Sequence, residues 1–256
     1  MLYENNFSNA FEKNTSLNEW SILLSYRGSI AHGMYLENIS DDKDYISICI
    51  PDKDYYLGLK NFGSRGTQEI KEGELDIVAY EFKKAICMLE KGNPNIITLL
   101  WNDPQFILKA SEEGKHLIRN RHIFANKNIY HSFCGYAKNQ MIKMVSGSFQ
   151  GYMGAKRKEL FIKHGYDCKN AAHLIRLLKM SEEFLRLGEF QVLRPDANIL
   201  LDIKNGLWTI DNIRKEAEGL FKACEEAYNK SRLPEKTNFD DVNKLCMEIL
   251  EMRFSK

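Results

Sequence analysis

Long hydrophobic runs and an excess of charge of one sign are both absent from this sequence. No stretch approaches the roughly 18 consecutive apolar residues of a membrane-spanning helix, and the first residues lack a basic region followed by an apolar run. The 36 Lys and Arg residues are balanced by 35 Asp and Glu residues. This balance argues against a protein whose whole surface is basic and binds nucleic acid through its positive charge. We therefore expect a soluble, cytoplasmic protein that does not bind membranes.

Cysteine pairing is also absent. The six cysteines are scattered, without a CxxC pair or a histidine at metal-ligand spacing, so the sequence suggests neither a zinc site nor a disulfide framework. We find no internal repeat and no low-complexity tract either. Reduced thiols in a globular protein are the simplest interpretation.

The sequence does contain a change of pattern along its length. Runs of β-branched and aromatic residues predict strands over 20–27, 45–50 and 74–82. Beyond about residue 129 the apolar spacing becomes helical, and helices are expected over 129–145, 152–164, 168–187, 209–231 and 238–254. We predict an α+β protein with two domains: residues 1–125, with a mixed sheet and flanking helices, and residues 126–256, which are helical.

Acidic residues are concentrated just downstream of a Gly-Ser turn. Asp42 and Asp44 stand two residues apart at the start of a predicted strand, so both carboxylates project from one face. A divalent cation relieves their repulsion, and Mg²⁺ is commonly held by carboxylates together with substrate phosphates. Two such ions about 3.5–4 Å apart can activate a hydroxyl and stabilise leaving pyrophosphate. The sequence therefore predicts that Asp42 and Asp44 bind a pair of divalent ions and that a third carboxylate completes the site.

Asp76 and the turn at Gly28 and Ser29 complete the predicted site. Asp76 interrupts an otherwise apolar strand, where a carboxylate without a partner would be costly. Glycine lets the backbone approach a phosphate closely, and exposed amides at the start of the following helix can donate to its oxygens. An Asp-rich turn alone is more often a solvated loop. The prediction therefore depends on finding a strand, the Gly-Ser turn, Asp-x-Asp before a second strand and a lone Asp in a later strand, in that order.

That order, Gly-Ser, then Asp-x-Asp, then a distal Asp, resembles the DNA polymerase β-like nucleotidyltransferase superfamily. Four blocks sharpen the resemblance: GSIAHGM, SDDKDY, LDIVAYEFKKAICMLEKGNPNIITLLW and GYDCKNAAHLIRLLKMSEEFLRLGEFQVLRPD. Together they resemble the predicted bacterial and phage nucleotidyltransferases related to those associated with RNA repair. The resemblance implies a mixed-sheet nucleotidyltransferase core with a helical carboxyl-terminal part, and transfer of a nucleoside monophosphate from an NTP.

The resemblance also assigns roles to individual residues. Gly28 and Ser29 match the phosphate-binding motif, Asp42 and Asp44 match the metal pair, and Asp76 matches the third carboxylate. The family often has Ser-Asp-x-Asp, and here Asp41 stands in the place of that serine. The expected cofactor is Mg²⁺, with Mn²⁺ as the alternative ion. No dedicated general base is evident, and we expect Asp76 to contact the attacking hydroxyl.

A basic segment over residues 138–179 contrasts with the acidic one. After an expected N-cap at Asp167, Lys169, His173 and Arg176 recur at i, i+4 and i+7 and so share one helix face. We predict that this row binds nucleotide, as does Arg27 beside the turn. On the preceding helix a second basic group is predicted to bind the acceptor backbone, with a solvated face as the even alternative: Lys156, Arg157, Lys158 and Lys163.

The leading hypothesis is a Mg²⁺-dependent nucleotidyltransferase that transfers NMP from an NTP to a hydroxyl of an RNA end, such as a tRNA end, and releases pyrophosphate. Its partner molecules are therefore an NTP and an RNA acceptor. Two alternatives remain open at this point. The same chemistry can have a protein Ser, Thr or Tyr hydroxyl as acceptor, or the fold can serve as a nucleotide- or RNA-binding module without turnover.

Overall fold

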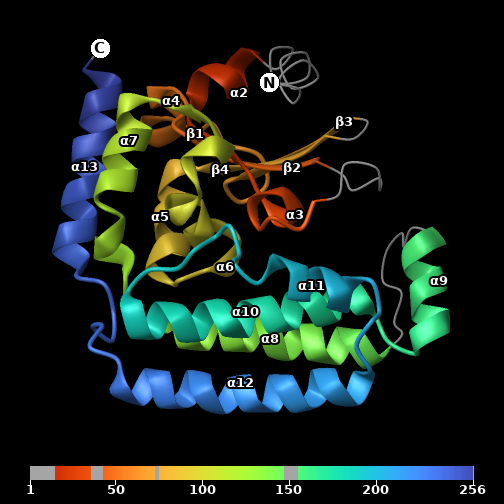
Figure 1. Ribbon diagram of the computed structural model, residues 1–256. Coiled ribbons are helices and arrows are strands. Elements are labelled where there is room, and N and C mark those ends of the chain that lie inside the picture. Colours follow the sequence, from red (N-terminus) through yellow and green to blue (C-terminus); the bar gives the residue numbers. More distant parts are fainter. Residues whose placement is uncertain (1–14, 36–42, 73–74, 147–154, 256) are drawn as a thin grey trace. The chain divides into compact units, whose positions relative to one another are not determined.

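The computed structural model describes residues 15–35, 43–72, 75–146 and 155–255 (Figure 1). In chain order the elements are α2 (Thr15–Trp20), β1 (Ser21–Tyr26), α3 (Gly28–Ala31), β2 (Lys43–Cys49), α4 (Lys53–Leu57), β3 (Thr67–Glu72), β4 (Leu75–Glu81), α5 (Phe82–Glu90), α6 (Pro94–Ile97), the 3₁₀ helices η1 (Thr98–Trp101) and η2 (Pro104–Phe106), β5 (Ile107–Ala110), α7 (Glu112–Arg119), the 3₁₀ helix η3 (Arg121–Phe124), α8 (Asn128–Ser146), α9 (Ala155–His164), α10 (Cys168–Leu187), α11 (Ala197–Lys204), α12 (Ile210–Lys230) and α13 (Phe239–Phe254). The chain divides into two compact units. The first contains the chain up to residue 90 together with 95–124 and 238–256, and the second contains 91–94 and 125–237.

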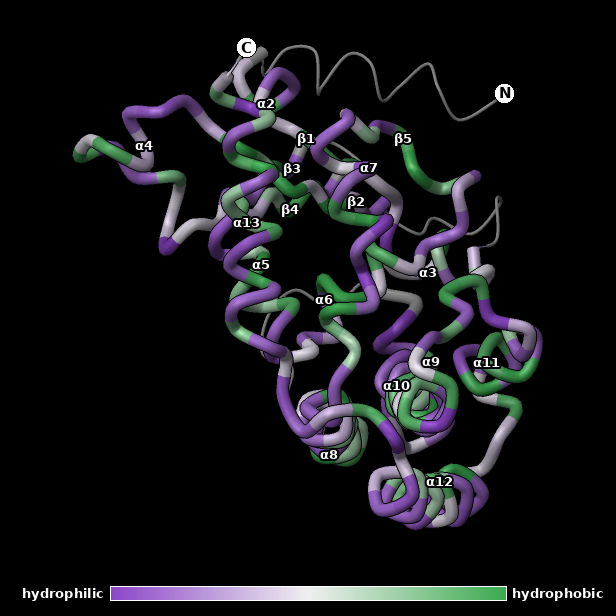
Figure 2. Tube along the Cα trace, turned by 90° about the vertical axis from the view of Figure 1, so that its left-hand side faces the viewer, coloured by the Kyte–Doolittle hydropathy of each residue, from purple (hydrophilic) through white to green (hydrophobic). Residues whose placement is uncertain are grey.

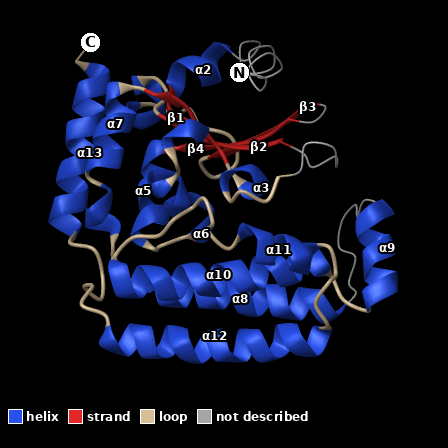
Figure 3. Ribbon diagram, in the orientation of Figure 1, coloured by secondary structure: helices blue, strands red, loops and turns tan. Residues whose placement is uncertain are grey.

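The first unit is built on a five-stranded mixed sheet in the order β3-β4-β2-β1-β5. The pairing of β2 with β4 is parallel, and the other three pairings are antiparallel. All strands of the described chain belong to this unit, and they are drawn in red in Figure 3. Every residue of β1 and the last five of β2 are buried, which explains why these strands read as nearly continuous apolar runs.

Helices pack on this sheet through their apolar faces. The buried residues of α5 are Phe82, Ala85, Ile86 and Leu89, a helical spacing that places them on one face. Helix α13 packs against α5 and α7. It is also tied to the unit by two polar contacts: Glu248 lies 3.0 Å from His116 Nε2, and Arg253 donates to the Glu19 carbonyl at 2.9 Å.

The second unit is helical, with α10 packed between α8 and α12. Helix α10 has twelve buried residues, the most of any described helix. In Figure 2, where α12 is seen nearly end-on, its coil carries both hydrophilic and hydrophobic colours. This agrees with its buried positions at Ile213, Ala217, Cys224 and Ala227, which form a single stripe. No helix within the described residues has the length and apolar composition needed to cross a bilayer.

The structure confirms the predicted fold class, a mixed sheet with flanking helices and a helical carboxyl-terminal region. The two units differ from the predicted boundaries mainly at α13. This helix was expected in the helical domain over 126–256 but packs within the first unit, where it contacts α5, α7 and η3 and buries Val242, Leu245 and Ile249. The described elements β3, β5, α7 and α11 were not predicted from the sequence.

Candidate functional site

The Gly-Ser turn lies directly against the carboxylate of Asp44. The backbone N–H of Arg27 donates to the Asp44 carbonyl at 2.9 Å, which extends the pairing of β1 with β2 into the turn. The Met34 N–H donates to the Ser29 carbonyl at 2.8 Å, just beyond the short helix α3. Gly28 has φ +65°, and a Cβ there would lie 2.6 Å from Asp44 Oδ2. Glycine is required at this position by the backbone conformation and by the close approach.

Asp44 and Asp76 are brought together by the parallel pairing of β2 and β4. They are register partners in that pairing, and partners on strands about 4.8 Å apart project from the same face of the sheet. Their side chains are 34% and 25% exposed, so both carboxylates reach solvent. Like charges placed directly opposite each other on neighbouring strands repel. The pair therefore needs positive charge close by.

Two cationic side chains supply that charge. Arg27 Nη2 lies 3.4 Å from Asp76 Oδ1 and 3.8 Å from Asp44 Oδ1, so one guanidinium contacts both carboxylates. Lys71 is the register partner of Asp76 on β3, and its Nζ lies 3.5 Å from Asp76 Oδ2. The carboxylates thus project into a small cluster of opposite charge at one end of the sheet.

Asp42, the other member of the predicted Asp42–Asp44 pair, lies outside the described residues, as does Asp41. Among the residues that are described, no three His, Cys, Asp or Glu side chains gather as a metal-binding group. Asp44 and Asp76 nevertheless offer carboxylate oxygens on one face with solvent access, and these are the hard donors that Mg²⁺ takes in proteins. The chemistry of this pair therefore fits a hard divalent cation.

Asn102 fixes the end of β1 from which the turn starts. Its Nδ2 donates to Ser25 Oγ at 2.6 Å and to the Tyr26 carbonyl at 3.0 Å. Ser25 Oγ in turn donates to the Phe106 carbonyl at 2.8 Å. Asn102 is only 6% exposed, and buried amides with satisfied hydrogen bonds hold their surroundings in one arrangement. Asn102 therefore positions the backbone immediately before Arg27.

The predicted nucleotide-binding row on α10 runs from solvent into the interior of the second unit. Lys169 is exposed, His173 is half-buried and Arg176 is 8% exposed. Arg176 Nη1 contacts Met180 Sδ at 3.2 Å, and a thioether is a weak acceptor for a guanidinium. Within the described part of the chain, no carboxylate lies within ion-pair distance of these three side chains.

Burial and neighbouring positive charge act together on this row. The pKa of His173 is held well below 6.5 by burial and then by the charges of Arg176, Lys169 and Lys143. Burial and the charge of Arg194 lower the pKa of Arg176 to about 9, so its guanidinium remains charged at neutral pH. The lowered pKa of His173 leaves its imidazole neutral at neutral pH, whereas Lys169 and Arg176 are cations without a carboxylate partner among the described residues and so attract an anion.

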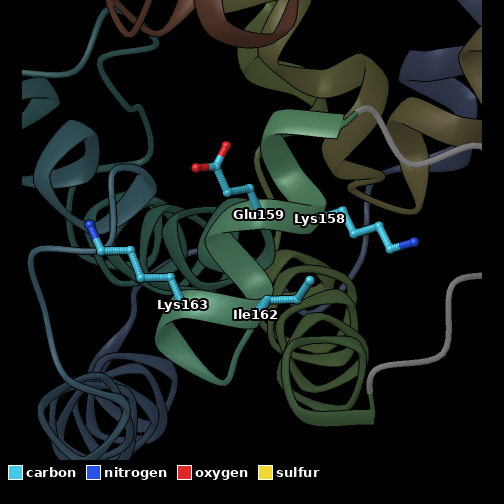
Figure 4. Close-up of a pocket in the computed structure, with 4 residues that line it drawn as sticks. All are labelled: Lys158, Glu159, Ile162 and Lys163. Atoms are coloured by element: carbon cyan, nitrogen blue, oxygen red, sulfur yellow. The ribbon is translucent and has the colours of Figure 1, made fainter.

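Helix α9 carries the side chains predicted to bind the acceptor, and the structure separates them. Arg157 is committed to an ion pair, because its Nη2 lies 2.5 Å from Asp167 Oδ2 and 3.1 Å from Asn170 Oδ1. Lys158 and Lys163 are exposed and point to opposite sides of α9, around a shallow hollow that Glu159 and Ile162 also line (Figure 4). The side chain of Lys156 lies outside the described residues. Arg157 therefore secures the start of α10, while Lys158 and Lys163 remain accessible.

Comparison with known families identifies the chain. The sequence model of the RNA repair pathway DNA polymerase beta family, RlaP, matches residues 4–248. This protein belongs to that family. A search of curated proteins finds no match to the chain. RlaP is a polymerase β-like nucleotidyltransferase family, so the predicted superfamily is confirmed and the general activity class is supported.

The RlaP match covers both units, and within the first unit it includes residues that pattern alone did not single out. Lys71 and Asn102 were both missed. Lys71 shares its strand with Thr67 and Glu69, and no local signal marks it as the partner of Asp76. Asn102 follows the apolar IITLLW stretch, where a polar residue after an expected helix reads as an ordinary cap. Both residues have their role through contacts with another element: Lys71 with Asp76 on the neighbouring strand, and Asn102 with the last residues of β1.

The depressed pKa of His173 leads to a prediction about pH and stability in this RlaP protein. Because the folded state resists protonation, the unfolded state binds more protons as the pH falls below 6.5, and wild-type stability should decline there. We expect His173→Gln to remove that part of the decline. Urea midpoints between about pH 7.5 and pH 5.5 measure the effect, with His122→Gln at an exposed position as the control. Equal acid sensitivity of the wild type and His173→Gln would contradict the prediction.

Proposed function

We propose that this protein transfers a nucleoside monophosphate from an NTP to the hydroxyl of an RNA end, with release of pyrophosphate and with Mg²⁺ as cofactor. The observation that carries the proposal is the register pairing of Asp44 with Asp76 beside the Gly28 turn in a chain of the RlaP family. A tRNA end is one acceptor of this class.

Asp44 and Asp76, with Asp42, are the residues that would hold the metal. When bound, a divalent cation of this kind lowers the pKa of a coordinated hydroxyl and neutralises charge on phosphate oxygens. Mn²⁺ would satisfy the same hard oxygen donors. The geometry of the described pair favours this assignment, because both carboxylates share one sheet face and reach solvent.

The chain's own residues would bind and orient the reactants. The turn at Gly28 and Ser29 would lie along the triphosphate, since a glycine in the left-handed region keeps the backbone free of side-chain bulk. The acceptor hydroxyl oxygen attacks the α-phosphorus, and the bond from that phosphorus to the bridging oxygen of pyrophosphate breaks. Asp76 is our choice for the group that takes the hydroxyl proton.

The cations of the second unit would bind anionic parts of the substrates. Lys169 and Arg176 have no carboxylate partner in the described structure, so a phosphate group would supply the missing negative charge. The neutral imidazole of His173, on the same helix face, would donate a hydrogen bond to that group. Lys158 and Lys163 are exposed and suited to an RNA backbone. Lys156 belongs to the same proposed group because of its place in the sequence. Arg157 is also a member, but Asp167 already neutralises its charge.

The experiment that tests the proposal separates the acceptors directly. The wild type and an Asp44→Asn/Asp76→Asn variant are incubated with each α-labelled NTP, Mg²⁺, and total cellular RNA and protein, and the products are treated with nuclease or protease. We expect the wild type alone to label nuclease-sensitive material, and the effective NTP identifies the nucleotide.

Other outcomes would contradict the proposal in distinct ways. Label that survives nuclease but not protease would move the acceptor to a protein hydroxyl. Absence of label with every NTP would favour a nucleotide- or RNA-binding module without turnover. Equal labelling by the wild type and the double variant would remove the two carboxylates from the mechanism.

A further inference from the structure

Arg27 lies against both carboxylates of the proposed metal site. Its Nη2 contacts Asp76 Oδ1 at 3.4 Å and Asp44 Oδ1 at 3.8 Å, which are oxygens of the pair assigned above to the divalent cation. Its Nε is buried and has no hydrogen-bond acceptor within the described residues. Thus the guanidinium neutralises the carboxylates at long contact distances and leaves one of its own donors unused.

These contacts are longer than those of a well-formed arginine–carboxylate pair. A bidentate arginine–carboxylate pair has two parallel hydrogen bonds of about 2.7–2.9 Å, whereas Arg27 divides one Nη2 between two carboxylates at 3.4 and 3.8 Å. By contrast, Arg157 in the same chain reaches Asp167 Oδ2 at 2.5 Å. Arg27 is therefore held loosely by charge, which makes it replaceable by a more highly charged ion.

We propose that Arg27 is a built-in competitor of the divalent cation: it neutralises Asp44 and Asp76 while the metal is absent and leaves them when the metal binds. This inference rests on the proposed function, since it takes Asp44 and Asp76 as metal ligands. The guanidinium that leaves retains all its donors, including the unused Nε, for a phosphate oxyanion of the incoming triphosphate. Metal binding frees the Arg27 guanidinium for the triphosphate, and nucleotide binding draws that guanidinium away from Asp44 and Asp76. Each ligand therefore raises the affinity of the protein for the other.

Lys71 provides an internal comparison. Among the described residues its ion pair is with Asp76 alone, at 3.5 Å, and its side chain is 69% exposed, whereas that of Arg27 is 29% exposed. An exposed lysine can leave its carboxylate with little loss of contact, because solvent already screens the pair. Lys71 should therefore compete with the metal much less than Arg27 does.

The test is a titration of the nucleotide-free protein with Mn²⁺ alone, in which the electron paramagnetic resonance signal reports free ion. We expect Arg27→Gln to bind Mn²⁺ about fivefold more tightly than the wild type, the upper end for a solvent-accessible ion pair. Lys71→Gln should change the affinity by less than about twofold. Arg27→Lys, which keeps the charge, should stay closer to the wild type than Arg27→Gln does.

An increase in metal affinity is a result that a purely structural role for Arg27 would not produce. Unchanged or weaker Mn²⁺ binding by Arg27→Gln would overturn the inference, and Arg27→Met provides the same test if the glutamine variant does not fold. Asp76→Asn separates this failure from that of the proposed function. If Asp76→Asn binds Mn²⁺ as well as the wild type, the metal site itself is wrongly assigned and the inference about Arg27 falls with it.

Discussion

Replacing Asp76 with asparagine is expected to reduce nucleotidyl transfer about 10³-fold, because a bound metal contributes several kcal/mol of transition-state stabilisation that the neutral amide would forfeit. The same change should scarcely affect folding. It removes solvent-accessible contacts with Arg27 and Lys71, each worth about 0–1 kcal/mol. It also removes the repulsion between Asp76 and its register partner Asp44.

The measurement is the initial rate of incorporation from an α-labelled NTP at saturating Mg²⁺, combined with thermal unfolding of each variant. Asp54→Asn is the matched control, since Asp54 is 47% exposed on α4 and forms its ion pair with Lys60 at 2.6 Å. This control makes the same change in charge within the same unit and should keep the wild-type rate. The loss of a metal ligand should lower the rate by far more than about twofold. A rate for Asp76→Asn within about twofold of the wild type would therefore exclude Asp76 from the site.

The residue types of this site were predictable from sequence, but their arrangement was not. A Gly-Ser turn after an apolar strand, Asp44 at the start of the next strand, and a lone Asp76 in a later strand are local signals with a chemical reason. The parallel pairing that makes Asp44 and Asp76 register partners joins strands far apart in the chain. Nothing in the spacing of residues within either strand specifies that pairing.

Helical spacing predicts which residues share a face, but it does not predict what that face contacts. Spacing placed Lys169, His173 and Arg176 on one side of α10, and the structure adds that exposure falls from Lys169 to Arg176. On α9, composition alone could not distinguish Arg157, which neutralises Asp167, from its accessible neighbour Lys158. The depth of a charge and its partner are set by packing between elements.

The carboxyl-terminal helix makes the same point for domain organisation. Its apolar spacing predicted a helix over 238–254, and the structure has this helix at Phe239–Phe254 with Val242, Leu245 and Ile249 buried. Such a pattern is satisfied equally by any apolar neighbour, so it carries no information about which unit provides that neighbour. The assignment to the first unit comes from packing of α13 on α5 and α7.

Gly28→Ala is expected to reduce nucleotidyl transfer by about 10²-fold, because a shift of about 1 Å in a reacting geometry can cost that much. Two effects combine at this position. Gly28 has φ +65°, which costs about 1–2 kcal/mol for a residue with a Cβ. The new methyl group would also lie 2.6 Å from Asp44 Oδ2, so the carboxylate must move.

Gly165→Ala separates these two effects of the Gly28 change. Gly165 has φ +76°, but a Cβ at this position would have no neighbouring atom within 4 Å, so alanine there brings the backbone cost without the contact. Both variants should unfold at lower temperature than the wild type, yet only Gly28→Ala should lose activity when rates are measured well below both melting temperatures. If Gly28→Ala keeps the wild-type rate, the close approach of the turn to Asp44 is not needed for catalysis. If Gly165→Ala loses as much activity as Gly28→Ala, backbone strain rather than displacement of the Asp44 carboxylate explains the loss.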